Sequence, residues 1–336
     1  PMMTQHYVEP VRNCATSLHW GVRRSLELGN PTGFGYCANQ ALNFDILSGQ
    51  PLAVVEQNWR RLRAGVMEHQ QWLALGPVDT WGQMSANLLG MHAGDPAIPS
   101  GPRFDYAASM AEFRRIGVTT STLFAVVAAT YLSTVFNDPA RVLSERAEYA
   151  AELAAPINVP TFGQTLILWF ALLARLDLNE GMDSAFPEEL ERLRALARQV
   201  PANHAHRVDI IEAELVMRAG NPVGAGAKLE AAFLHARAQR MLGDAAIIAE
   251  RGARLAERMG SAIIARAWRR EAIESYAAWG ATAKVERLRA AWPDAELDTS
   301  RLAPTASTTL DLDAVLRAAE TIAGEMDLDR LLSRTM

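Results

Sequence analysis

Short turn signals made of Gly, Pro, Asn and Asp recur along the chain at intervals of about one helix, and they limit the possible folds more than any other feature. A glycine that can adopt positive φ ends one helix, and an N-cap residue or a first-turn proline begins the next. The segments between the signals have helical periodicity, and none shows the alternation typical of a strand. The sequence therefore predicts an all-α protein. The signals are Gly29-Asn30-Pro31, Gly49-Gln50-Pro51, Gly76-Pro77, Asn137-Asp138-Pro139, Gly220-Asn221-Pro222, Gly243-Asp244 and Gly260-Ser261.

The helices are predicted to form repeated antiparallel pairs. Short turns force neighbouring helices to run in opposite directions, and predicted helix starts recur at roughly 40 residues, the range of helical repeat families. Ala225, Leu229 and Ala232 have the spacing of the small and large packing positions in the second helix of a TPR unit. The predicted fold class is a right-handed α-solenoid of degenerate TPR-like helix pairs.

Polar breaks divide the chain into four predicted parts. The break at residues 94–102 separates N-terminal helical repeats (1–93) from TPR-like repeats (103–292). A linker is predicted over 293–307, and a final helix over 308–336.

The final helix carries a short coiled-coil seam, in which apolar residues alternate spacings of three and four. We expect residues 310–336 to form a weak homodimer, although the helix could equally fold back on the repeats. The seam residues are Leu312, Val315, Ala319, Ile322 and Met326.

Charge and cysteine content indicate a cytoplasmic protein. The formal net charge of −5 gives no reason to expect nucleic acid or an anionic membrane as partner. Cys14 and Cys37 are expected to be reduced, because the N-terminus has no signal peptide. Residues 117–137 and 153–174 lack charge over the length of a membrane span, but Ser, Thr and Pro interrupt them, so both are predicted to be buried helices.

Two motifs that imitate ligand sites are better explained by structure. Residues 33–38 match a GxGxxA fingerprint, but no strand precedes them, so a helix start is expected. His204 and His206 with Glu212 and Glu214 could suggest a metal. The two glutamates, however, point about 200° apart on a helix, and the spacing fits no common zinc pattern. We expect no cofactor and no metal, with His206 hydrogen-bonded between repeats.

An enzyme remains the alternative, because some all-helical glycosidases use two acids across a cavity. The acid pair Glu188 and Glu189 follows Pro187 directly, where the helix dipole favours negative charge without any catalysis. Asp311 and Asp313 allow the same explanation. The eight tryptophans are spread at helical spacing, and most are expected in the core.

The second half of the chain resembles a known family. An Asn-x-x-His pattern with an Ile-Glu-Ala-Glu helix, a Trp-Gly-Ala-x-Ala-Lys turn and a Leu-Asp-Leu helix lie at Asn203–His206, Ile211–Glu214, Trp279–Lys284 and Leu310–Leu312. They resemble the helical-repeat region of bacterial multidomain sensor proteins, which join an AAA-type ATPase or kinase-like module, TPR-like repeats, a GAF domain and often a histidine kinase. The chain has no GxxxxGK[ST] loop, kinase signature or GAF body.

The resemblance implies a non-catalytic regulatory segment of a signal-transduction protein. It implies a protein, a peptide or a small effector in the solenoid groove, contacts with neighbouring domains, and a final helix that leads toward a downstream domain. The positions with an implied structural or interaction role are Asn203, His206, Glu212, Glu214, Trp279, Gly280 and Lys284.

Overall fold

The computed structural model describes residues 5–154, 162–180, 182 and 185–295. Residues up to Ala295 belong to one compact unit, and residues 296–336 belong to a second unit outside the described part. The described residues form α-helices and two short 3₁₀ helices, with no β-strand among them. The predicted all-α class is confirmed.

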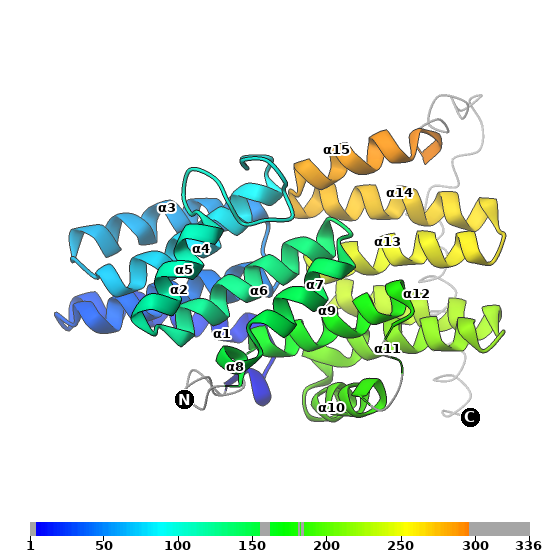
Figure 1. Ribbon diagram of the computed structural model, residues 1–336, viewed down its shortest axis with the longest axis horizontal. Coiled ribbons are helices and arrows are strands. Elements are labelled where there is room, and N and C mark those ends of the chain that lie inside the picture. Colours follow the sequence, from blue (N-terminus) through cyan, green and yellow to red (C-terminus); the bar gives the residue numbers. More distant parts are fainter. Residues whose placement is uncertain (1–4, 155–161, 181, 183–184, 296–336) are drawn as a thin grey trace, which may run out of the picture. The chain divides into compact units, whose positions relative to one another are not determined.

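Figure 1 shows the helices in chain order. Most of them are close to 17 residues long, which matches the spacing of the turn signals. Their bounds are η1 Gln5–Tyr7, α1 Val11–Glu27, α2 Pro31–Leu47, α3 Leu52–Glu68, α4 Trp72–Leu88, α5 Tyr106–Ile116, α6 Thr119–Val135, α7 Pro139–Glu148, α8 Ala150–Leu153, α9 Phe162–Leu178, α10 Ala185–Gln199, α11 Pro201–Arg218, α12 Pro222–Ala238, α13 Leu242–Arg258, α14 Ala262–Trp279, α15 Thr282–Ala291 and η2 Pro293–Ala295.

Consecutive helices pack as pairs. The most extensive contacts join α1 to α2, α11 to α12 and α13 to α14, and α3 also packs on α4. Contacts then continue from one pair to the next through α2–α4, α4–α6, α6–α9, α9–α11 and α11–α13. This sequential pairing is consistent with the predicted helical repeat array.

Two of the helices that join successive pairs, α6 and α9, are buried on nearly all sides. In α6 almost every residue from Ser121 to Val135 is buried, and α9 is similar. Two of the threonine hydroxyls in α6 are satisfied within the helix, since Thr130 and Thr134 donate to the carbonyls of Val126 and Thr130 at 2.8 Å. Within the described residues, the charge-free segments 117–137 and 153–174 therefore consist mainly of buried helix. None of the described helices combines the length and the apolar character needed to cross a lipid bilayer.

Glycine and asparagine end the helices at most of the predicted turns. Gly29, Gly49, Gly220 and Gly260 have positive φ, and Asn137 does the same with a φ of 61°. Asn30 and Asn221 then cap the following helices by accepting a backbone N–H in the first turn. Residues 33–38 lie inside α2, as expected for a helix start.

The predicted turn at Gly76-Pro77 is wrong, because Pro77 lies inside α4. The chain turns earlier, at Gln70, whose φ is 54°. A proline in the second turn of a helix removes only one backbone hydrogen bond, whose acceptor would be the carbonyl of Leu73. Leu73 lies near the start of the helix and is 88% exposed, so water can reach this part of the backbone.

The predicted turn at Gly243-Asp244 is also misplaced. The chain turns at Arg240, with a φ of 55°, and α13 already begins at Leu242. Gly243 is needed for packing instead of for the turn: a Cβ atom there would lie 2.3 Å from the hydroxyl oxygen of Tyr131 and 3.1 Å from the ring of Trp279. In the sequence alone, a glycine required by close helix packing therefore cannot be told from a glycine that ends a helix.

Cysteines and tryptophans largely follow the predictions. Cys14 and Cys37 are free and buried, and burial raises the pKa of the Cys14 thiol to about 12. Six of the eight tryptophans belong to the core or pack against it, whereas Trp20 and Trp72 are more than half exposed. The six are Trp59, Trp81, Trp169, Trp268, Trp279 and Trp292.

Replacing Ala232 with Arg should disrupt the array. Ala232 is fully buried on α12, which packs against α11 and α13. A buried, unpaired guanidinium and the overpacking around it should together cost several kcal/mol. Thermal unfolding checks this, with Leu234→Arg as the control, because Leu234 lies on the same helix and is 55% exposed. Equal melting temperatures for the two variants would contradict the helix register.

Candidate functional site

The candidate site is a set of buried charges centred on α13. This helix is buried along most of its length, and yet it carries Asp244, Glu250 and Arg251, each at most 3% exposed. A charge buried at this depth is stable only with a close partner. Neighbouring helices supply the partners in three groups.

The first group joins α13 to α11 at the start of α13. One carboxylate oxygen of Asp244 accepts from His206 Nε2 and from Arg207 Nε, both at 2.8 Å. Burial would raise the pKa of Asp244, but the charge of Arg207 and the hydrogen bond from His206 hold it below its usual value. Burial lowers the pKa of His206. The group is therefore a carboxylate held by a guanidinium and a neutral imidazole.

The second group joins α13 to α14 and α15 and to the turn after α6. Glu250 accepts from Lys284 Nζ at 2.8 Å and from the Tyr276 hydroxyl at 2.9 Å. Asn137 donates to the same carboxylate at 2.6 Å. Burial would raise the pKa of Glu250, but the charges of Lys284 and Arg254 lower it. Burial lowers the pKa of Lys284.

The third group joins α13 to α11 and to the end of α9. Arg251 donates from Nε to Glu214 at 2.7 Å and binds both carboxylate oxygens of Asp177 at 2.9 Å. Arg258 binds the other oxygen of Glu214 at 2.8 Å. Burial would raise the pKa values of Asp177 and Glu214, but the charge of Arg251 lowers both.

These groups keep their acids ionised. A general acid needs the opposite, a carboxyl whose pKa is raised toward neutral pH. Three described carboxyls do have a pKa raised by burial: Asp79 on α4, Glu145 on α7 and Asp209 on α11. Arg63 binds the first of these, and the Tyr106 hydroxyl donates to the second.

Asn203 and Trp279, two of the residues singled out by the family resemblance, tie distant parts of the chain together. Asn203 on α11 accepts from the backbone N–H of Val11 at 2.8 Å and donates to the carbonyls of His6 and Glu9. Trp279, at the end of α14, donates from Nε1 to the carbonyl of Gln50 at 3.1 Å. The late helices of the unit are thus hydrogen-bonded to its first two helices and the turns beside them.

The remaining resemblance positions also have structural partners. His206, Glu214 and Lys284 belong to the three buried groups. Gly280 takes a φ of 95° and ends α14. Glu212 binds Arg194 on α10 and Lys228 on α12.

The possible metal and acid-pair residues have partners of other kinds. His204 Nδ1 lies 3.4 Å from the guanidinium of Arg207, and no cluster of His, Cys, Asp and Glu among the described residues is arranged to hold a metal ion. Glu189 forms ion pairs with Arg146 and Arg175, and Glu188 lies in the first turn of α10. The predicted dimer seam and residues 310–336 lie outside the described residues.

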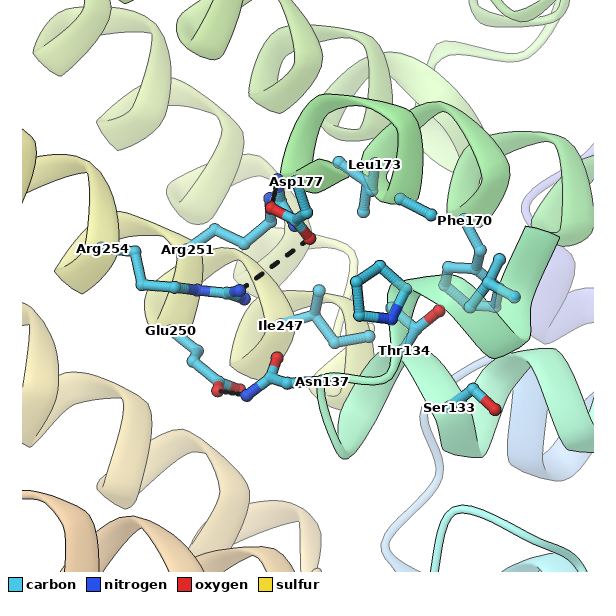
Figure 2. A pocket seen from close by; sticks show the side chains of 13 residues that line it. Ser133, Thr134, Asn137, Phe170, Leu173, Asp177, Ile247, Glu250, Arg251 and Arg254 are labelled. Atoms are coloured by element: carbon cyan, nitrogen blue, oxygen red, sulfur yellow. Dashed lines mark hydrogen bonds and ion pairs between the residues drawn. The ribbon is translucent and has the colours of Figure 1, made fainter. Parts of the chain in front are cut away.

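A polar hollow lies beside the buried groups (Figure 2). It is bounded by the end of α6 and the start of α7, by α9 and by α13. Its polar lining includes Asn137, Asp177, Glu250, Arg251 and Arg254, and the rest of the lining is largely apolar. The hollow is shallow, because its accessible volume is only about 10 Å³, roughly the room that one water molecule needs.

Sequence reasoning missed Asp244, Arg207, Arg251 and Asp177. The only pattern for the residues of α13 is that positions 244, 251 and 258 are charged and recur every seven residues. Residues at this spacing share a helix face. Glu250, Arg254 and Glu257 are charged too, so the sequence alone does not distinguish this row from a solvent-exposed one. The partner residues have no comparable signal, since they come from other helices.

No protein-family model matches the chain, and neither the curated proteins nor the solved structures contain a significant match.

Proposed function

We propose that the chain is a non-catalytic, partner-binding segment of a bacterial signal-transduction protein. In this proposal it is a TPR-like array that works with AAA-type ATPase, GAF and histidine-kinase modules. The proposal rests on the observation that two of the resemblance positions, Asn203 and Trp279, form hydrogen bonds between segments about 190–230 residues apart in the chain. Hydrogen bonds such as those of Asn203 and Trp279 hold the early and late helices together. In this proposal the array therefore moves as one body and relays a conformational change between the modules.

The pairing of the buried acids favours a scaffold over an enzyme. An all-α enzyme with a carboxylate pair in a central cavity needs two acids with different pKa values facing a substrate. Asp244, Glu250 and Glu214 instead contact cations within 2.8 Å, and all three have lowered pKa values. Repeat arrays commonly use their extended surface to bind proteins and peptides.

Pairwise binding tests this proposal. The chain would be titrated by calorimetry with AAA-type ATPase, GAF and histidine-kinase modules of the kind that the family resemblance implies. At least one module should bind with micromolar affinity, and Ala232→Arg, which should disrupt the array, should abolish binding. The absence of binding by every module, together with turnover of a substrate by the chain, would contradict the proposal.

The seam at residues 310–336 predicts weak self-association. Its apolar stripe covers only about two heptads, so dimerisation should depend on concentration. Light scattering on the intact chain and on a version ending at Pro304 should give the larger average mass for the intact chain. Equal masses at high protein concentration would remove the support for a dimerising helix.

A further inference from the structure

We propose that residues 5–10, which we call the N-terminal latch, form an acid-sensitive device: protonation of His6 releases the latch from α11 while the helices stay folded. The latch consists of η1 and the turn that leads into α1. The device adds a conformational change to the array and does not depend on which partner the array binds.

His6 occupies a buried site that suits only a neutral imidazole. The residue is 1% exposed, and both of its ring nitrogens lack a hydrogen-bond partner. The ring centroids of Phe44 on α2 and Phe162 on α9 lie 6.1 and 5.9 Å from that of His6. Burying an imidazolium without a hydrogen-bond acceptor is strongly unfavourable, so the latched state excludes the proton.

The groups around His6, as far as the structure describes them, are neutral or positive. On α11, the ring of His204 lies 5.8 Å from that of Phe162, and the guanidinium of Arg207 lies 4.9 Å from the same phenyl ring. Tyr7, beside His6 in η1, is a neutral phenol, because burial raises its pKa. A proton on His6 would therefore add a second positive charge around the aromatic ring that Arg207 already contacts.

The acids on the elements near the latch already have partners. On α1, which packs against η1, the thiol of Cys14 is neutral because burial raises its pKa to about 12. The described residues thus offer no free counter-ion to a protonated His6. The acids and their partners are Glu9 with Gln5 and Asn13, Glu27 with Arg24, Asp45 with His19 and Asn58, Asp177 and Glu214 with Arg251, Glu212 with Arg194 and Lys228, Asp244 with His206 and Arg207, and Asp209 near Lys228 and His235.

Few contacts hold the latch, so it can open without unfolding the array. Asn203 on α11 accepts from the N–H of Val11 at 2.8 Å and donates to the carbonyls of His6 and Glu9 at 2.9 and 3.0 Å. Val8, between these two residues, is 73% exposed. The following helix α1 packs mainly on α2 and keeps that contact when the latch opens. Segments with few buried contacts open locally at a lower free energy than the whole unit.

Acid favours the released state, because the released imidazole binds a proton more tightly. The pKa of His6 is about 4 in the latched state, where burial lowers it, and 6.5 when the ring is in water. The released form therefore gains protons first as the pH falls through this window. The ratio of released to latched molecules should be about tenfold higher at pH 5.5 than at neutral pH.

Hydrogen exchange of the full chain at pH 7.5 and 5.5, read by mass spectrometry, tests the device. Protection factors are compared, since they correct for the effect of pH on the intrinsic exchange rate. The amides of residues 8–13 should lose about tenfold in protection at pH 5.5, while α14 stays more protected than the latch at both pH values. His6→Phe keeps an aromatic ring that cannot be protonated, and it should show a much smaller loss. His92→Phe, in the loop after α4, is the matched control and should follow the parent.

Three results would overturn the inference. They are protection of residues 8–13 that is independent of pH, a loss in His6→Phe equal to that of the parent, and equal protection of the latch and α14 at pH 5.5. The last result would mean that the segment opens only when the whole unit unfolds. Asn203→Ala removes the three hydrogen bonds but keeps His6, so it should release the latch at both pH values. Parent-like protection of this variant at pH 7.5 would also count against the latch.

Discussion

Replacing Lys284 with Met should lower the free energy of unfolding by about 3–5 kcal/mol, the usual cost of breaking a buried ion pair from one side. Lys284 and Glu250 are both 3% exposed at their side chains and are joined at 2.8 Å. Without the ammonium, Glu250 keeps its hydrogen bonds from Tyr276 and Asn137 but loses its close positive partner. Urea unfolding at neutral pH measures the loss.

The double variant Lys284→Met with Glu250→Gln separates the charge from the packing. Removing both charges leaves a neutral amide that can still bond to Tyr276 and Asn137, so much of the lost stability should return. A single variant that loses less than about 1 kcal/mol would show that the pair is dispensable. A double variant as unstable as the single one would assign the loss to packing.

Acid should unfold the array at a higher pH than its carboxylates alone would predict. Burial lowers the pKa of His6 from its usual 6.5 to about 4, and it also lowers the pKa values of His204 and His206. The unfolded chain therefore binds more protons than the folded chain below pH 6.5, and stability falls as the pH falls through this window toward 4. The shift of His6 alone corresponds to about 3 kcal/mol. Urea unfolding at several pH values measures the slope.

The variant His6→Phe tests this slope directly. His6 is 1% exposed, both of its ring nitrogens lack hydrogen-bond partners, and it packs against the rings of Phe44 and Phe162. A phenyl ring keeps that packing and cannot be protonated, so the variant should lose less stability between pH 6.5 and 4. His92→Phe, in the loop after α4, is the control and should follow the parent. A His6→Phe variant with the parent's pH profile would contradict the prediction.

The sequence predicted the helices well because their ends have local causes. Gly220 ends a helix with positive φ and Asn221 caps the next, and both effects depend on only a few neighbouring residues. Ala232 was placed correctly in a helix contact from spacing alone. The two turns that were wrong depend on tertiary contacts or on tolerance of a proline. Gly243 is small because Tyr131 lies against it, and Pro77 costs α4 only one hydrogen bond.

The candidate site was less predictable, because its contacts join residues far apart in the chain. The resemblance singled out His206 and Lys284, but their partners Asp244 and Glu250 lie 38 and 34 residues away. No local pattern connects these positions. The groove for a partner that the sequence suggested stays a prediction.

Hydrogen exchange of the variant Asn203→Ala tests most directly the claim that the recognisable polar residues tie the late helices to the early ones. The change removes three hydrogen bonds from α11 to residues 6, 9 and 11. Mass spectrometry should show faster deuterium uptake in η1 and α1, with α14 unchanged. Asn221→Ala is the matched control, because Asn221 only caps α12, and it should leave α1 protected. Unchanged exchange of α1 in Asn203→Ala, or an equal increase in both variants, would contradict the account.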